Sequence, residues 1–298
     1  MCDSTRYIFL QGGLGNQMFQ YAFYLAQKNK AISVKCDISM ILHQNQHNGY
    51  ELERLFGIYL SADQKVFLLL RSMYYCTVNK QKLIYRIAMN MLKKMKYKLF
   101  MDIIPSVYIP TLLEPDGKRL FLLGYWQTEY YFSDIRNEIL HVFHFNETLL
   151  SSNTEIMKSD IMSCESVSIH VRRGDYLSEE NKDMYGGICT AEYYQKAINL
   201  ILEKLQTPIF YVFSNDMDWV RKNLDVPNPV FVDFNQGVDS WQDMFLMSQC
   251  KHNIIANSSF SWWGAWLNQN PTKIVISPSR FINSNYPSDI IPEAWIRL

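Results

Sequence analysis

Two adjacent arginines, Arg172 and Arg173, are the side chains of this sequence best suited to chemistry. They follow the strand-like run 167–171 and stand between His170 and Asp175. Arginine presents a rigid fork of N–H donors that binds phosphate through two parallel hydrogen bonds. At a strand end the chain can turn and direct both side chains into a cleft. The pair therefore predicts a phosphate site, with an ion-paired surface pair as the alternative.

A second polar cluster, Asn257, Ser258, Ser259 and Phe260, follows the predicted strand 253–256 and opens a helix. Asn or Ser at this place caps the helix. The N–H groups of the first turn and the helix dipole then favour an anion. The alternative is a capped helix whose tryptophans only fill the core, and the two interpretations are compatible.

A third cluster is the glycine-rich turn 11–17, which lies between a predicted strand and a helix. Its spacing does not fit the dinucleotide fingerprint, because the third glycine would fall on a methionine. Glycines allow a turn to pass close to a ligand or to a partner helix. The cleft-loop candidates in this turn are Gly13, Gly15, Asn16 and Gln17.

A divalent metal is the rival to the arginines, because Asp216 and Asp218 form an Asp-x-Asp pattern after the predicted strand 209–213. Such a pair can hold a cation on a diphosphate. The favoured interpretation is that Asn215 or Asp216 caps the helix 217–224. We therefore predict no metal site.

The helices and strands that position these residues are predicted most clearly in the second half of the chain. Short β-rich runs alternate with helices, which predicts an α/β fold with a parallel, doubly wound sheet. The predicted strands are 167–171, 209–213, 230–234, 253–256 and 273–277, and the helices are 191–205, 217–224, 241–250 and 260–268. In such sheets ligands bind beyond the carboxyl ends of the strands.

The first half begins in the same way, with strand 7–10, helix 17–27 and strand 32–37, followed by a helical segment over 62–100. A strand at 120–125 and a helix at 131–142 complete it. The apolar pattern thins out near 150–165. We therefore expect two domains, 1–155 and 156–298.

Composition excludes several classes of protein. The 298 residues are 48% hydrophobic and carry a formal net charge of zero, so neither disorder nor nucleic-acid binding is indicated. No signal peptide or membrane span is apparent. The six scattered cysteines are typical of reduced thiols. These features predict a cytoplasmic protein.

The segment 65–100 carries nine basic residues and no acidic residue. With its interleaved apolar side chains it predicts amphipathic helices with a cationic face. One interpretation is a solvated face. The other is a peripheral contact with the anionic inner face of a membrane, where lipid-linked oligosaccharides would be acceptors.

Taken together, the three clusters resemble the α-1,2-fucosyltransferase family. The markers of this family stand unbroken at Gly12–Tyr21, His170–Tyr176 and Ala256–Leu267. The resemblance is to bacterial-type members without a membrane anchor. It implies a GT-B-like fold of two Rossmann-like domains facing a cleft, with GDP-fucose bound by 156–298 and the acceptor by 1–155.

The resemblance also implies the site residues. Arg172 is similar to the family's essential diphosphate ligand. Asp233 is similar to the residue that holds the guanine edge in related enzymes. The implied donor-binding set is His170, Arg172, Arg173, Asp233, Asn257, Ser258, Ser259 and Phe260. The implied activity is transfer of L-fucose from GDP-β-L-fucose, with inversion, to the 2-hydroxyl of a galactosyl glycan.

Fixed cations and helix N–H groups can stabilise the departing GDP, so no metal cofactor is expected. A base would take the acceptor proton. Asp175 is the catalytic candidate for that role or for orienting Arg172, while Glu179, Glu180 or no base at all stay open. A metal-dependent Asp-x-Asp glycosyltransferase and a non-catalytic glycan-binding module are the alternative functions.

Overall fold

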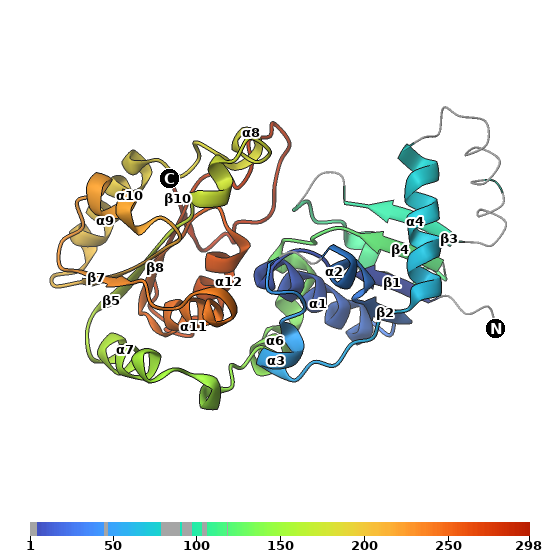
Figure 1. Ribbon diagram of the computed structural model, residues 1–298, viewed down its shortest axis with the longest axis horizontal. Coiled ribbons are helices and arrows are strands. Elements are labelled where there is room, and N and C mark those ends of the chain that lie inside the picture. The colour runs from blue at the N-terminus through green and yellow to red at the C-terminus, as the bar shows by residue number, and fades with distance from the viewer. Residues whose placement is uncertain (1–4, 45–46, 79–89, 91–96, 103–105, 118) are drawn as a thin grey trace. The chain divides into compact units, whose positions relative to one another are not determined.

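The computed structural model describes residues 5–44, 47–78, 90, 97–102, 106–117 and 119–298 and divides the chain into two compact units (Figure 1). Unit 1 is Met1–His144 and unit 2 is Phe145–Leu298. The division precedes the expected 155/156 boundary, which would cut through helix α7 (Ser152–Ser163). Phe145 stacks on Trp241 with ring centroids 5.6 Å apart, and α7 packs on α11 (Trp241–Gln249), so both segments belong to unit 2.

Unit 1 is built on a four-stranded sheet in the order β2-β1-β4-β3, and every neighbouring pair is parallel. The strands are β1 (Arg6–Phe9), β2 (Val34–Asp37), β3 (Tyr97–Met101) and β4 (Arg119–Leu123). The helices are α1 (Leu14–Asn29), α2 (Ser39–Gln44), α3 (Leu52–Phe56), α4 (Gln64–Val78) and α6 (Arg136–Val142). Phe9 meets Phe121 edge-on at 5.5 Å, and Leu70 and Met73 of α4 pack against them.

Strand β3 corrects the sequence prediction, which extended a helical segment to residue 100. Residues 97–101 instead pair in parallel with 119–123 along the edge of the sheet. The many Lys and Met residues before this segment favour a helix locally, but pairing with β4 decides the backbone conformation. The predicted helix is present at α4, and 79–89 and 91–96 lie outside the described residues.

Unit 2 contains a six-stranded sheet in the order β10-β9-β8-β5-β6-β7, again with parallel neighbours. The strands are β5 (Ser166–Val171), β6 (Ile209–Ser214), β7 (Pro229–Val232), β8 (His252–Ile254), β9 (Val275–Ser277) and β10 (Ile296–Arg297). The other helices are α8 (Lys182–Tyr185), α9 (Ala191–Lys204), α10 (Met217–Asn223) and α12 (Ser259–Leu267). The five predicted strands and four predicted helices of this half are confirmed, whereas α7, α8 and β10 were not predicted.

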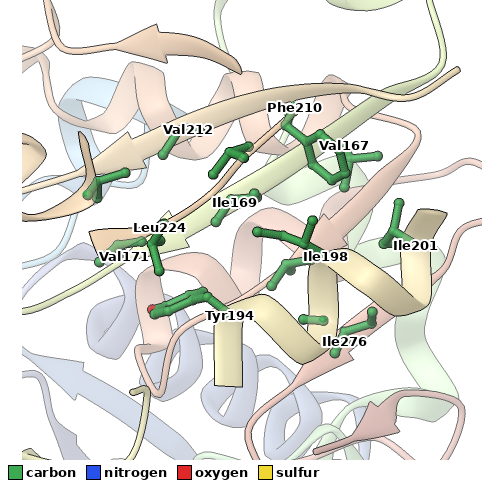
Figure 2. Close-up of a cluster of buried hydrophobic side chains, with 14 of the residues drawn as sticks. Val167, Ile169, Val171, Tyr194, Ile198, Ile201, Phe210, Val212, Leu224 and Ile276 are labelled. Atoms are coloured by element: carbon green, nitrogen blue, oxygen red, sulfur yellow. The ribbon is translucent and has the colours of Figure 1, made fainter. Parts of the chain in front are cut away.

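The core of unit 2 follows from the spacing of its apolar residues (Figure 2). Alternate residues of β5, Val167, Ile169 and Val171, share one face of the sheet and are fully buried. Tyr194 and Ile198 of α9, four residues apart, cover that face. Ser166, Ser168 and His170 alternate with these residues on the opposite face and are buried as well, so both faces of β5 are covered.

The strand order of unit 2 reverses at β5. The chain runs outward from β5 through β6 to β7 and then returns to place β8 on the other side of β5, where Ile169 pairs with Ile254. The site of such a reversal in a parallel sheet opens a crevice at the carboxyl ends of the strands, where ligands bind. Among the described residues, no helix is both long and apolar enough to cross a membrane.

Candidate functional site

Both polar clusters of unit 2 lie at the strand ends where the sheet order reverses. Arg172 and Arg173 directly follow β5, and Asn257 follows β8, its parallel neighbour. The rings of His170 and Phe260 lie 5.8 Å apart, which joins the two clusters physically. The sheet therefore brings together residues from two distant sequence motifs.

Arg172 is held by a two-point ion pair with Asp175. Its Nε lies 2.8 Å from Oδ1 and its Nη2 lies 2.9 Å from Oδ2 of the carboxylate. The Asn215 amide donates a longer hydrogen bond, 3.4 Å, to the same Oδ1. Because both carboxylate oxygens face the guanidinium, the geometry favours orientation of Arg172 as the role of Asp175, one of the two roles that the sequence left open.

Arg173 contacts a different set of residues from those that contact Arg172. Its guanidinium lies 4.0 Å from the centroid of the Trp219 ring, and its Nε lies 3.5 Å from Asp216 Oδ2. Its backbone N–H donates to the side-chain oxygen of Asn215 at 2.9 Å. A Cβ at Gly174 would lie 2.8 Å from the Asn215 amide nitrogen, so a larger residue here would displace that amide. The two arginine side chains thus point to different elements. The side chain of Arg172 lies near Tyr176, and that of Arg173 packs against the start of α10.

Asn257 has its side chain fully engaged inside the protein. Its amide nitrogen donates to the carbonyl oxygens of Tyr185 (3.2 Å) and Phe281 (3.0 Å), and its side-chain oxygen accepts from the Cys189 thiol (3.4 Å). The residue is 3% exposed. The side chain of Asn257 therefore fixes the turn before α12, and its role in donor binding stays a prediction.

The first turn of α12 is capped as the sequence predicts. The Ser258 hydroxyl accepts the Phe260 N–H at 3.3 Å, and Ser258 is buried. Ser259 and Phe260 are partly exposed at the helix start. This end of α12 carries the positive end of the helix dipole and contains no acidic residue in its first turn.

His170, the fifth residue of β5, is buried at 5% exposure beside this helix end. Burial and the nearby Arg172 charge lower the pKa of His170 to about 3, so its imidazole is neutral at physiological pH. Its Nδ1 is buried and has no hydrogen-bonding partner among the residues that the structure describes. A buried polar atom of this kind is costly unless a ligand or water satisfies it.

Tyr176, which sequence reasoning did not assign to the site, connects its two halves. Its hydroxyl donates to the backbone oxygen of Asn257 at 3.1 Å, and its ring stacks on Tyr185 at 4.9 Å. The Arg172 guanidinium lies 5.9 Å from the same ring. The sequence could have indicated this role, because Tyr176 is the last residue of the family marker His170–Tyr176.

Two further carboxylates proposed from sequence have different surroundings: Asp216 lies beside Arg173 of this cluster, whereas Asp233 pairs with another arginine. Asp233 follows β7 and pairs with Arg221 at 3.0 Å, both side chains being about half exposed. Asp216 caps α10 by accepting the Trp219 N–H at 3.2 Å, as the favoured interpretation predicted. Asp218 is exposed, as are Glu179 and Glu180. Within the described ranges, no group of three or more His, Cys, Asp and Glu side chains could hold a metal ion.

The glycine-rich turn belongs to unit 1 and connects β1 with α1. Gly12 adopts φ +77°, a conformation that glycine tolerates best. Gln17 is fully buried: its amide nitrogen donates to the carbonyls of Gly12 (2.9 Å) and Gly49 (2.8 Å), and its side-chain oxygen accepts the Glu51 N–H (3.1 Å). Gln17 thus braces the turn from inside, which leaves no side-chain donor of Gln17 for a ligand.

The other candidate residues of the turn differ in how far they are exposed to solvent. Gly15 is buried, while Gly13 and Asn16 are partly exposed. A Cβ at Gly13 would lie 3.4 Å from the His47 ring. The Asn16 side-chain oxygen accepts the Gln127 amide at 2.8 Å. Asn16 and Gln127 therefore present a pair of amides on unit 1.

The geometry of unit 2 suits a bound anion. A guanidinium oriented by a carboxylate, a capped helix N-terminus and a neutral buried imidazole meet at one strand edge. Such groups bind phosphate oxygens and stabilise negative charge that develops on them.

Comparison with known proteins agrees with this geometry. The family model described as glycosyl transferase family 11 matches residues 5–298. The chain is 33% identical to the O-antigen biosynthesis glycosyltransferase WbnK of Escherichia coli, with 98% of this chain and 100% of that protein covered. It is 34% identical to the alpha-1,2-colitosyltransferase of Escherichia coli, with 97% of each covered. The fold is similar to that of the fucosyltransferase NodZ from Bradyrhizobium (TM-score 0.51, 12% identity, 89% of this chain and 92% of that chain covered).

Proposed function

The chain belongs to glycosyl transferase family 11 and has a GT-B-type fold, and we propose that it transfers L-fucose from GDP-β-L-fucose to the 2-hydroxyl of a galactosyl glycan. The family membership confirms the expectation of a glycosyltransferase. It also disfavours the non-catalytic glycan-binding module. Two relatives named for sugar transfer, each matched over nearly the whole chain, support the same class of reaction.

The observation that carries the proposal is the convergence of three groups at the β5/β8 edge: Arg172, the start of α12 and the buried His170 Nδ1, which has no partner in the described part of the chain. When the bond between the sugar and the phosphate breaks, the electron pair passes to the diphosphate. The guanidinium and the N–H groups of α12 are fixed where that charge grows, which lowers the barrier. Because its imidazole is neutral, His170 can form a hydrogen bond to the diphosphate and adds no positive charge beside Arg172.

Inversion at the sugar follows from a single displacement, in which the acceptor oxygen bonds to C1 as the diphosphate leaves. A fixed guanidinium can supply the charge stabilisation that a divalent cation supplies elsewhere, so we propose a metal-independent reaction. Asp216 supports this proposal, because its carboxylate is used by the α10 cap and by Arg173.

The test is transfer itself. Purified protein is incubated with GDP-fucose and a panel of galactosyl acceptors, and the product linkage is determined by mass spectrometry and NMR. An α-1,2-fucosyl product supports the proposal. Hydrolysis without transfer to any acceptor, or a different linkage, contradicts it.

GDP-colitose is the second donor to test, because the chain is 34% identical to an alpha-1,2-colitosyltransferase. Colitose differs from L-fucose by one missing hydroxyl. A site that hydrogen-bonds this hydroxyl discriminates strongly against the deoxy sugar. Competition between the two donors, measured as the ratio of kcat/KM values, decides which one the enzyme uses.

We further propose that the enzyme is cytoplasmic and docks on the anionic inner face of the membrane through segment 65–100, next to lipid-linked acceptors. In α4, Lys65, Leu68, Arg71 and Tyr75 are all exposed, with Leu68 at 57% and Tyr75 at 47%. The Arg71 guanidinium lies 5.7 Å from the Tyr75 ring centroid. Exposed apolar and basic side chains on one helix suit an anionic bilayer, at about 1 kcal/mol per base.

Sedimentation with liposomes tests this docking. The protein should pellet with anionic vesicles at low salt, less at physiological salt, and not with neutral vesicles. The double variant Lys65→Glu/Arg71→Glu should remain in the supernatant, whereas Lys196→Glu, on the exposed surface of α9 in unit 2, should behave as wild type. Equal recovery in the supernatant under all conditions would assign segment 65–100 to an ordinary solvated face.

A further inference from the structure

We propose that Asn215 of unit 2 is a positioning residue for the transfer reaction, because it fixes the turn in which Asp175 orients Arg172. This role rests on the proposed function and belongs to a residue outside the donor-binding set implied by the sequence. Asn215 acts through Asp175 and Arg172, and all three residues lie in unit 2.

Asn215 directly follows β6, the parallel neighbour of β5. Val171 and Ser214 are the last paired residues of these two strands. Arg172 and Asn215 are therefore the first residues beyond the paired edge. The Ser214 hydroxyl accepts the Asp216 N–H at 2.9 Å, which holds the chain in a turn at this point. The register of the sheet thus places Asn215 beside the arginine turn.

The side-chain amide of Asn215 joins two groups of that turn. Its oxygen accepts the backbone N–H of Arg173 at 2.9 Å. Its nitrogen donates a longer hydrogen bond, 3.4 Å, to Oδ1 of Asp175. The same Oδ1 lies 2.8 Å from Nε of Arg172. One carboxylate oxygen therefore connects the Asn215 amide with the guanidinium of Arg172.

The two groups that Asn215 joins need opposite hydrogen-bonding partners. The backbone N–H of Arg173 can only donate, and the carboxylate of Asp175 can only accept. Asparagine carries an acceptor and a donor on one short fork and so suits both. Aspartate has the same size but carries acceptors alone, so its second oxygen would face the Asp175 carboxylate and repel it.

Gly174 leaves room for this amide. A Cβ at Gly174 would lie 2.8 Å from the amide nitrogen and 3.5 Å from Cγ of Asn215. Gly174 does not adopt a positive φ, so alanine fits its backbone conformation. Replacing Gly174 by alanine would therefore act through the amide that the new methyl group displaces.

The ion pair between Arg172 and Asp175 needs such support, because both side chains are partly exposed. A partly exposed pair is weakly held on its own. Stabilisation of the charge that grows on the departing diphosphate requires groups fixed before the reaction begins. A displacement of about 1 Å can lower the rate by about 100-fold. The amide of Asn215 supplies a fixed point for the carboxylate that directs Arg172.

The test is Asn215→Ala, which removes both hydrogen bonds. We expect kcat for transfer to fall about 10- to 100-fold and the donor KM to change less than about threefold, because the loss falls on the transition state. Gly174→Ala should cause a similar loss. Gly174→Ala/Asn215→Ala should be no slower than Asn215→Ala, since the new methyl group then meets no amide. Asn199→Ala removes an exposed side-chain hydrogen bond of 3.2 Å on α9 and, as the matched control, should transfer like wild type.

A double variant distinguishes positioning from a direct or a merely structural role. If Asn215 acts through Arg172, Arg172→Ala/Asn215→Ala should transfer within about twofold of Arg172→Ala. Losses that multiply in the double variant would overturn the assignment, because Asn215 would then act independently of Arg172. A folded Asn215→Ala protein whose kcat is less than about tenfold below wild type would overturn it as well.

If Asn215→Ala does not fold, Asn215→Asp decides. This variant keeps the volume and the acceptor for the Arg173 N–H, but it places a second carboxylate against Asp175. A kcat at least about tenfold below wild type supports the positioning role, and a smaller loss contradicts it. A wild-type protein that transfers sugar from neither GDP donor would refute the proposed function and this role with it. An active wild type with equally active Asn215 variants refutes the positioning role alone, which separates the two failures.

Discussion

Replacing Arg172 by alanine tests the centre of the proposed donor site. The substitution removes the guanidinium that Asp175 orients at 2.8 and 2.9 Å. The pair is partly exposed, at 30% and 41%, so its net contribution to stability is only about 0–1 kcal/mol. In a unit of this size that corresponds to a fall in Tm of at most about 2–4 °C. The variant should therefore fold.

Transfer should suffer far more than folding. Loss of one charge-assisted contact to the departing diphosphate costs about 3–4 kcal/mol of transition-state stabilisation. At 1.36 kcal/mol per decade this is about a 10²- to 10³-fold loss in rate. Arg172→Lys should recover little, because an ammonium group cannot reproduce the two-point geometry.

The assay combines steady-state transfer, GDP binding by calorimetry and thermal unfolding. Lys196→Ala, which removes an exposed helix ion pair at 2.7 Å in the same unit, is the matched control and should change none of them. If Asp175 only orients Arg172, the double variant Arg172→Ala/Asp175→Ala should be no slower than Arg172→Ala alone. A folded Arg172→Ala protein with activity within tenfold of wild type would refute the reasoning.

Three further outcomes are expected. Transfer should survive saturating EDTA; complete loss that manganese or magnesium restores would assign a cation to Asp216 in place of its helix cap. Tyr176→Phe deletes the hydrogen bond to Asn257 and should raise the KM for the donor several-fold while the far-ultraviolet CD spectrum stays unchanged; an unaltered KM would remove Tyr176 from the site. Burial raises the pKa of Asp243 to about 7, so the folded state binds more protons than the unfolded chain between about pH 4 and 7, and stability falls as the pH rises through that range. Asp243→Asn keeps an acceptor for the Asn235 amide and should raise Tm at pH 8 by about 2–4 °C, with no gain at pH 4; equal shifts at both pH values would contradict the linkage.

Five strands and four helices of unit 2 could be predicted from its sequence, for a physical reason. β6 is a short apolar run bounded by Pro208 and Asn215, and α9 shows the helical spacing seen at Tyr194 and Ile198. Because parallel strands present their carboxyl ends on one edge, the convergence of Arg172 and Ser258 also followed from the pattern. The divergence of Arg173 did not, since it depends on the Trp219 ring of a different helix.

Unit 1 shows what local pattern cannot reveal. β3 exists because residues 97–101 pair with a strand about twenty positions later, and nothing in its Lys-rich surroundings marks it. Asp102 and Trp126 likewise acquire their surroundings from contacts between two strand ends. The role of Gln17 as an internal brace depends on the carbonyl of Gly49, a residue 32 positions away. Side chains committed to such contacts are indistinguishable in sequence from those left available to a ligand.

The pairing of β5 with β8 has a consequence for how the enzyme reaches its active form. Partners such as Ser168 and Asn253 are 85 positions apart, and β6 can pair with β5, and β7 with β6, before β8 joins the sheet. Closing a long loop carries an entropy cost that only the completed contacts repay, so distant parallel pairing is slow. The arginine turn and the start of α12 are therefore expected to come together late in folding. Recovery of GDP binding after dilution from denaturant would report this last event, separately from the earlier recovery of helical CD signal.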